Sequence, residues 1–84
     1  MKRHLLLALT AMLLLAGCNN LTQENYNKVK TGMHYDEVVS ILGKPESCSE
    51  ALGLMSCEWK DGDAEVAISF IAKKVTITTG SGLK

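Results

Sequence analysis

Three hydrophobic patterns follow one another along this chain of 84 residues. Residues 5–17 form an almost continuous apolar run, which only Thr10 interrupts. Residues 22–42 place apolar side chains at helical spacing, and from Glu46 onward apolar and polar residues alternate. The chain is therefore expected to consist of an apolar leader, a helical region and a region of β-strands.

The apolar leader has the features of a bacterial signal peptide. Lys2, Arg3 and His4 form a basic region in front of it, and small residues end it. A transmembrane helix would need about 20 apolar residues to cross a bilayer, whereas this run has only 13 positions, from residue 5 to residue 17. We therefore expect residues 1–17 to be a signal peptide.

The leader ends in Leu15-Ala16-Gly17-Cys18, which is similar to the lipobox of bacterial lipoproteins. The resemblance implies that Cys18 becomes the first residue of the mature protein. It also implies that Cys18 carries the lipid that attaches the protein to a membrane. Residues 18–21 are then the lipidated cysteine and a short tether, and residues 22–84 form the domain.

Two short helices are expected at the start of the domain. Thr22 is a good N-cap for a first helix that runs to about Lys30, and Gly32 then breaks it. A second helix is expected over residues 35–42, because Gly43 supplies the residue that commonly ends a helix. Each helix is too short to be stable alone and must pack on other elements.

The alternating region predicts β-strands that are joined by turns. Four segments alternate in this way: 46–49, 56–60, 64–71 and 75–79. Asp61-Gly62-Asp63 is a hairpin turn signal between two of them. In the last segment Val75 and Ile77 are expected to face one way, and Thr76 and Thr78 the other.

These elements predict an α+β fold. We expect two N-terminal helices packed on a three-stranded antiparallel meander sheet, as a two-layer sandwich that the signal peptide precedes. One face of the sheet should take the helices, and the other should remain polar or available.

Removal of the leader changes the size and charge of the chain. Residues 18–84 number 67, and the loss of Lys2 and Arg3 leaves seven basic against nine acidic side chains. This small net charge, without a basic patch, argues against nucleic acid as a partner. A domain of this size buries a small core and is marginally stable without further support.

That support is expected from Cys48 and Cys57, which remain as a pair once Cys18 carries lipid. Disulfides persist outside the cytoplasm, so we favour a structural disulfide between them. Their C-x8-C spacing differs from the CxxC of redox enzymes. Zinc would need four ligands, and His34 is the one further candidate in the mature chain, so we expect no metal.

The sequence shows no set of residues that indicates catalysis. The acidic side chains are scattered, the glycines do not form a phosphate loop, and Ser40 and Ser69 have no candidate base apart from His34. His34 is expected near solvent at the start of the second helix. We therefore expect neither an enzyme nor a cofactor, and no small-molecule substrate.

One segment, Ala51-Leu52-Gly53-Leu54-Met55, is unusually apolar for a loop between two strands. In one interpretation, Leu52 or Leu54 folds back to cap the small core. In the other, Leu52, Leu54 and Met55 are an exposed tip that contacts lipid or a partner. Trp59 poses the same choice, and a core position is the more common one.

Residues 26–45 resemble a known family. Their pattern is Tyr26-x-x-Val29-x-x-Gly32-Met33-x-Tyr35-x-Glu37-Val38-x-x-Ile41-Leu42-Gly43-x-Pro45. It is similar to the SmpA/OmlA group of small lipoproteins, which includes a subunit of the outer-membrane β-barrel assembly machine. It is also similar to the wider set of domains with the fold of the β-lactamase inhibitor protein. The greatest likeness is to an uncharacterised branch that carries a disulfide.

The resemblance implies a lipoprotein that works by binding an envelope protein, as an accessory or scaffold in outer-membrane or envelope assembly. Asn19 fits an outer-membrane location facing the periplasm, because the usual inner-membrane retention signal is an aspartate after the lipidated cysteine. The alternative is an inhibitor or a phage superinfection-exclusion lipoprotein, which would block an envelope protein.

Overall fold

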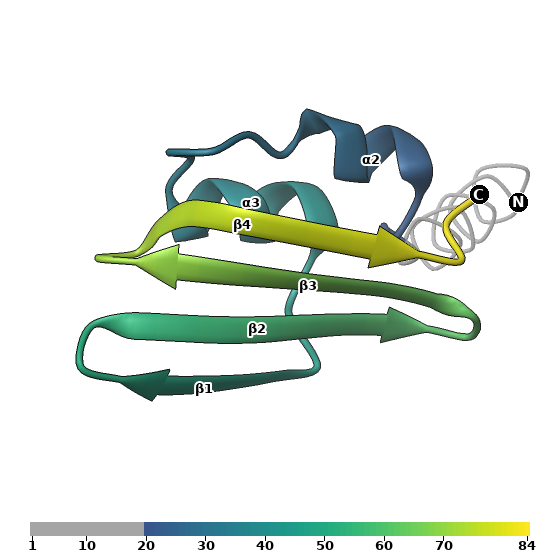
Figure 1. Cartoon of the computed structure of the whole chain (residues 1–84). Helices are drawn as coiled ribbons and strands as arrows, with labels where there is room; N and C mark the ends of the chain where they lie inside the picture. Colours follow the sequence, from purple (N-terminus) through teal and green to yellow (C-terminus); the bar gives the residue numbers. More distant parts are fainter. Residues whose placement is uncertain (1–19) are drawn as a thin grey trace, which may run out of the picture.

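The structure, a computed structural model, describes residues 20–84, so the predicted signal peptide and Cys18 lie outside the described residues. Two short helices pack against one face of an antiparallel sheet (Figure 1). The elements, in chain order, are α2 (Gln23–Lys28), α3 (Tyr35–Leu42), β1 (Ser47–Ala51), β2 (Leu54–Asp61), β3 (Ala64–Ile71) and β4 (Lys74–Ser81).

The expected three-stranded sheet is wrong, because the sheet has four strands in the order β1-β2-β3-β4. Each strand pairs with its neighbour in sequence. The four segments that alternate in the sequence are thus all strands of one sheet, whereas the expected sheet counts only three. All five residues of β1 are exposed, so burial contributes little to its formation, and its pairing with β2 holds it.

Side-chain caps explain where both helices begin. Thr22 Oγ1 accepts a hydrogen bond from the Asn25 backbone N–H at 3.1 Å, as expected of an N-cap. His34 Nδ1 accepts a hydrogen bond from the Asp36 N–H at 3.4 Å, and Glu37 Oε1 accepts one from the His34 N–H at 3.3 Å. This reciprocal capping box starts α3 and gives His34 a structural role near solvent.

The apolar core lies between the helices and the sheet. Tyr35 of α3 meets Phe70 of β3 edge to face, with ring centroids 5.4 Å apart. Trp59 is buried, and its indole Nε1–H donates a hydrogen bond to the Gly43 carbonyl oxygen at 2.8 Å, which ties the end of α3 to β2. The buried residues are Leu21, Val29, Val38, Leu42, Cys57, Trp59, Ala64, Val66, Ile68, Phe70 and Val75.

A β-bulge changes which face the side chains of β4 occupy. Ser69 pairs with Ile77, but the next residue, Phe70, pairs with Val75, so Thr76 is an extra residue on β4. Val75 is 1% exposed and Ile77 is 65% exposed. The expectation that these two residues share a face is therefore wrong, because one extra residue reverses the alternation.

The two edges of the sheet differ in their cover. The connection between α2 and α3 runs along β4, where the Gly32 N–H donates to the Val75 carbonyl oxygen at 2.8 Å and the Val75 N–H donates to the Met33 carbonyl oxygen at 2.9 Å. Within residues 20–84, β1 pairs only with β2, and Figure 1 shows it beyond the helix layer. β1 is therefore an open edge strand.

Candidate functional site

The face of the sheet opposite the helices is open to solvent (Figure 1). We call it the open face. Its centre consists of small polar or short side chains, such as Ser56 and Ser69, whose hydroxyl oxygens lie 3.4 Å apart across β2 and β3. A sheet face without a covering layer is available for contact with another molecule.

Four large apolar side chains lie exposed at one end of this face. Leu54 and Ile71 are direct cross-strand partners on β2 and β3. Ile77 lies on β4 opposite Ser69, one row nearer the centre of the face, and Leu52 lies in the turn between β1 and β2. We call these four residues the apolar patch; Leu52, Leu54, Ile71 and Ile77 are 106%, 50%, 55% and 65% exposed. An exposed apolar cluster on one face is typical of a binding surface.

The structure decides between the two interpretations of the apolar segment. Leu52 and Leu54 do not cap the core, because both side chains are exposed. Met55 differs from them, since it is half-buried on the helix-facing side of β2 and packs against the core. The segment is also not a long loop, because β1 and β2 extend into it and leave only Leu52 and Gly53 as the turn.

Two members of the apolar patch, Ile71 and Ile77, are not among the site residues that the sequence predicts. The alternation in β3 places Ile71 on the solvent side together with Glu65, so this position was visible in the sequence. Ile77 could not be found in this way, because the bulge in β4 moves it to the open face. The sequence carries no signal for that extra residue.

Leu52 combines full exposure with an unfavourable backbone conformation. Its φ is 53° and that of Gly53 is 83°, which is a two-residue turn with positive φ at both positions. Asparagine or glycine suits this conformation, whereas a bulky side chain rarely adopts it. A leucine that is both strained and fully exposed contributes little to the stability of the folded domain.

Replacement of Leu52 by asparagine is therefore expected to stabilise the domain by about 0.5 to 1 kcal/mol, because it relieves backbone strain and removes no packing. Urea unfolding of the chain from Asn20 onward measures the change. Ala72→Asn is the matched control, since Ala72 has φ 51° in the β3–β4 turn and lies outside the apolar patch. A loss of stability in Leu52→Asn but not in Ala72→Asn would show that Leu52 makes a stabilising contact within the domain.

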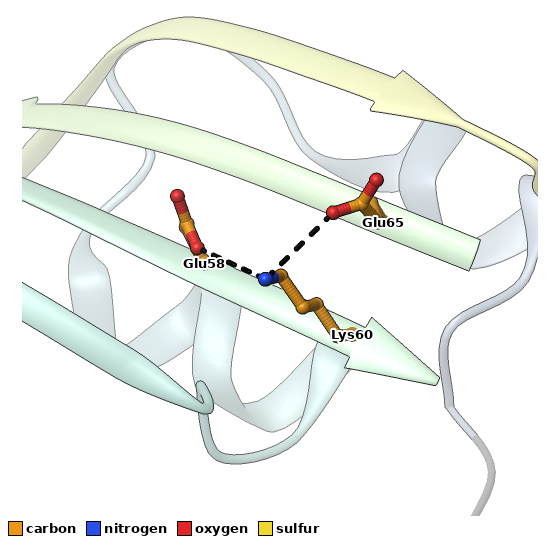
Figure 2. A network of polar contacts seen from close by, with 3 residues as sticks. All are labelled: Glu58, Lys60 and Glu65. Carbon is orange, nitrogen blue, oxygen red and sulfur yellow. Dashed lines mark ion pairs between the residues drawn. The ribbon is translucent and has the colours of Figure 1, made fainter. Parts of the chain in front are cut away.

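Charged side chains divide the open face into two halves. At the end away from the apolar patch, Lys60 Nζ lies 3.8 Å from Glu58 Oε1 and 3.9 Å from Glu65 Oε1 (Figure 2). These groups are about half exposed, so the pairs contribute at most about 1 kcal/mol each. A shallow depression of about 310 Å³ opens beside them over Ala67. At the patch end Lys74 is the cross-strand partner of Ile71, and Glu50 lies on β1 opposite Met55.

The predicted disulfide between Cys48 and Cys57 is confirmed. It joins directly opposed residues of β1 and β2, whose Cα atoms are 4.1 Å apart. Cys57 is buried in the core, whereas Cys48 is exposed because the helices do not reach over β1. The bond therefore connects the open edge strand to the core.

The described part of the chain offers no metal centre, since no three His, Cys, Asp or Glu side chains of residues 20–84 could hold a metal ion together. None of the helices described here has the length and apolar character to cross a membrane. The open face is thus the main feature of residues 20–84 that invites a functional explanation.

Two known family models match this chain, and together they define its class. The model of the prokaryotic membrane lipoprotein lipid attachment site matches residues 1–19, which include Cys18, so the protein is a lipid-anchored membrane lipoprotein. The beta-lactamase inhibitor (BLIP) model matches residues 16–84. The chain therefore belongs to the beta-lactamase inhibitor (BLIP) family. Comparisons with curated proteins and with solved structures found no match.

The family match bears on the resemblances that residues 26–45 show. It supports the wider one, to domains with the fold of the β-lactamase inhibitor protein. It does not single out the SmpA/OmlA group. The lipobox interpretation of residues 15–18 is supported by the lipid attachment match.

Proposed function

We propose that this lipoprotein is a membrane-anchored protein-binding module, which uses its open face to hold an envelope protein. One observation carries the proposal: four large apolar side chains lie exposed at one end of a sheet face that neither of the described helices, α2 and α3, covers. Exposure of such side chains to water costs solubility and gives the fold nothing. A partner that covers them provides a physical reason to keep them.

The place of action follows from the anchor. Asn19 supports an outer-membrane location, because the aspartate that usually retains lipoproteins at the inner membrane is absent after Cys18. The likeness of residues 26–45 to the SmpA/OmlA group supports a periplasm-facing accessory or scaffold in envelope assembly or integrity. The role is binding rather than catalysis, in keeping with the scattered acidic residues and the structural use of His34.

A second function is favoured by the family. The matching model describes a beta-lactamase inhibitor, a protein that inhibits an enzyme. The chain could use the same open face to block an envelope enzyme, or an envelope protein that an incoming phage requires. Both functions depend on the same surface and differ in the identity of the partner.

Photocrosslinking in the native bacterium tests the proposal. A photoreactive amino acid at Ser56 or Ser69 lies in the centre of the open face, whereas one at Asn27 lies on the exposed side of the helix layer. We expect one discrete protein adduct from the two open-face positions and none from Asn27. Adducts of equal yield from all three positions would contradict binding by the open face.

The identity of the adduct separates the two functions. A β-barrel or barrel-assembly protein would support the accessory role. A hydrolase, or a channel that phage use, would support the inhibitor role. Mass spectrometry of the adduct gives this answer in the same experiment.

A further inference from the structure

The membrane anchor and the apolar patch lie at opposite ends of the sheet. Leu21 lines a shallow groove together with Asp63 and Gly82, so the start of the domain lies beside the β2–β3 turn and the end of β4. The apolar patch lies at the other end, with the β1–β2 and β3–β4 turns (Figure 1). Strand β3 spans this distance with eight residues, or about 25 Å at roughly 3.3 Å per residue.

The anchor holds its end of the domain close to the lipid. The Asn20 carbonyl oxygen accepts hydrogen bonds from the Thr22 N–H at 3.1 Å and from Asn25 Nδ2 at 2.9 Å. These bonds fix Asn20 to the start of the domain, and only Asn19 separates it from Cys18 in the sequence. Two residues span about 7 Å when extended. The patch end can therefore stand well above the membrane, whereas the β2–β3 end cannot leave it.

The charges on the open face oppose a flat position on the lipid. Four carboxylates and one lysine lie near the anchor: Glu58, Glu65 and Lys60 on this face, and Asp61 and Asp63 at the adjacent turn. Pressed against the membrane, these carboxylates would meet phosphate groups of the same sign. An arrangement with the patch end raised from the surface avoids this contact.

The surroundings of the apolar patch define what it can accept. The turn residue Lys73 and the first β4 residue, Lys74, are both exposed beside it. The two turns also join there, because the Ala72 N–H donates to the Gly53 carbonyl oxygen at 3.1 Å. The result is one continuous tip with an apolar centre and two lysines on its β3–β4 side, while exposed Glu50 lies at its β1 edge. Such a surface is complementary to an apolar contact that carboxylates surround.

We propose that this tip binds a protein that projects above the anchoring membrane and presents an apolar side chain surrounded by Asp and Glu residues. The proposal rests on the proposed function and specifies the chemistry of the partner. A second copy of this chain fits less well, because patch-to-patch contact would bring the same lysines together. The anchoring membrane fits less well, because the lipid is attached at the opposite end of the sheet.

The test uses the full lipoprotein in the native bacterium, with a photocrosslinking amino acid at Leu52, which is fully exposed in the β1–β2 turn. One variant combines Lys73→Glu with Lys74→Glu. The matched control combines Lys28→Glu with Lys30→Glu, which makes the same charge change at exposed positions of the helix layer and its connection. We expect the yield of the protein adduct to fall about tenfold in the first variant and to stay unchanged in the control.

The partner supplies the confirming step. Mass spectrometry of the adduct gives the crosslinked peptide, which we expect to contain Asp or Glu. Replacement of those acidic residues of the partner by lysine should restore the adduct yield of the Lys73→Glu, Lys74→Glu variant. Equal amounts of each variant with an intact Cys48–Cys57 bond, seen on a non-reducing gel, exclude misfolding as the cause.

Several results would overturn the inference. An adduct of twice the chain mass would identify a second copy, and a lipid adduct would identify the membrane. If the tip variant and the control variant lowered the adduct yield equally, or if neither lowered it, Lys73 and Lys74 would have no specific role in binding. An adduct from Ser56 but not from Leu52 would leave the proposed function standing and reject this tip. The absence of any adduct from both positions would reject both.

Discussion

Replacement of Cys18 by serine is expected to abolish lipid attachment completely. The family match places the attachment site in residues 1–19, and processing of such a site depends on the thiol that receives the lipid. Without lipid, the domain has no described helix that could hold it in a membrane. Growth with radioactive palmitate should label the natural chain and leave Cys18→Ser unlabelled, either as an unprocessed precursor or as a released protein.

The control for this experiment is the pair Cys48→Ala with Cys57→Ala, which changes the other two cysteines. We expect this chain to carry the same amount of label as the natural one. Normal labelling and normal processing of Cys18→Ser would contradict the assignment of the anchor.

Removal of the disulfide is expected to lower the free energy of unfolding by about 2 to 3 kcal/mol, since the bond closes a short loop between residues nine positions apart. That loss is a large part of the stability of a small domain. We expect its local effect in β1, because all five residues of this edge strand are exposed and only β2 pairs with it in the described chain. The disulfide thus adds a covalent link between β1 and the core to the backbone pairing of β1 with β2.

Two measurements on the chain from Asn20 onward check this prediction. Urea unfolding of Cys48→Ala with Cys57→Ala gives the change in stability. Hydrogen exchange should show that the β1 amides lose protection while those of β3 keep theirs. A change below about 0.5 kcal/mol, the usual effect of a surface substitution, with β1 still protected would show that backbone pairing alone holds the edge strand.

The sequence predicted elements well wherever local chemistry determines them. The Thr22 cap, the Gly43 helix end and the Cys48–Cys57 pair are each decided by residue type at one or two positions. Strand β3 was also clear, because Val66 and its alternate neighbours are buried while the residues between them are mostly exposed.

The errors arise where pairing, not residue type, determines the structure. The sequence shows four alternating segments, but alternation alone does not tell how many of them pair in one sheet, and the sheet has four strands instead of three. The bulge at Thr76 depends on how β4 registers with β3, and a single sequence does not contain that information. The candidate site was therefore half predicted: Leu52 and Leu54 were found, Ile71 and Ile77 were not, and Met55 belongs to the core.

The most direct test of binding by the open face is hydroxyl-radical footprinting of the lipoprotein in isolated envelopes, compared with the same protein purified in detergent. The account predicts that labelling of Leu54, Ile71 and Ile77 falls in the envelope, because a partner covers the apolar patch. Labelling of Tyr26 and Met33 on the helix side should be the same in both samples. Equal labelling of the three patch residues in the two samples would contradict the account.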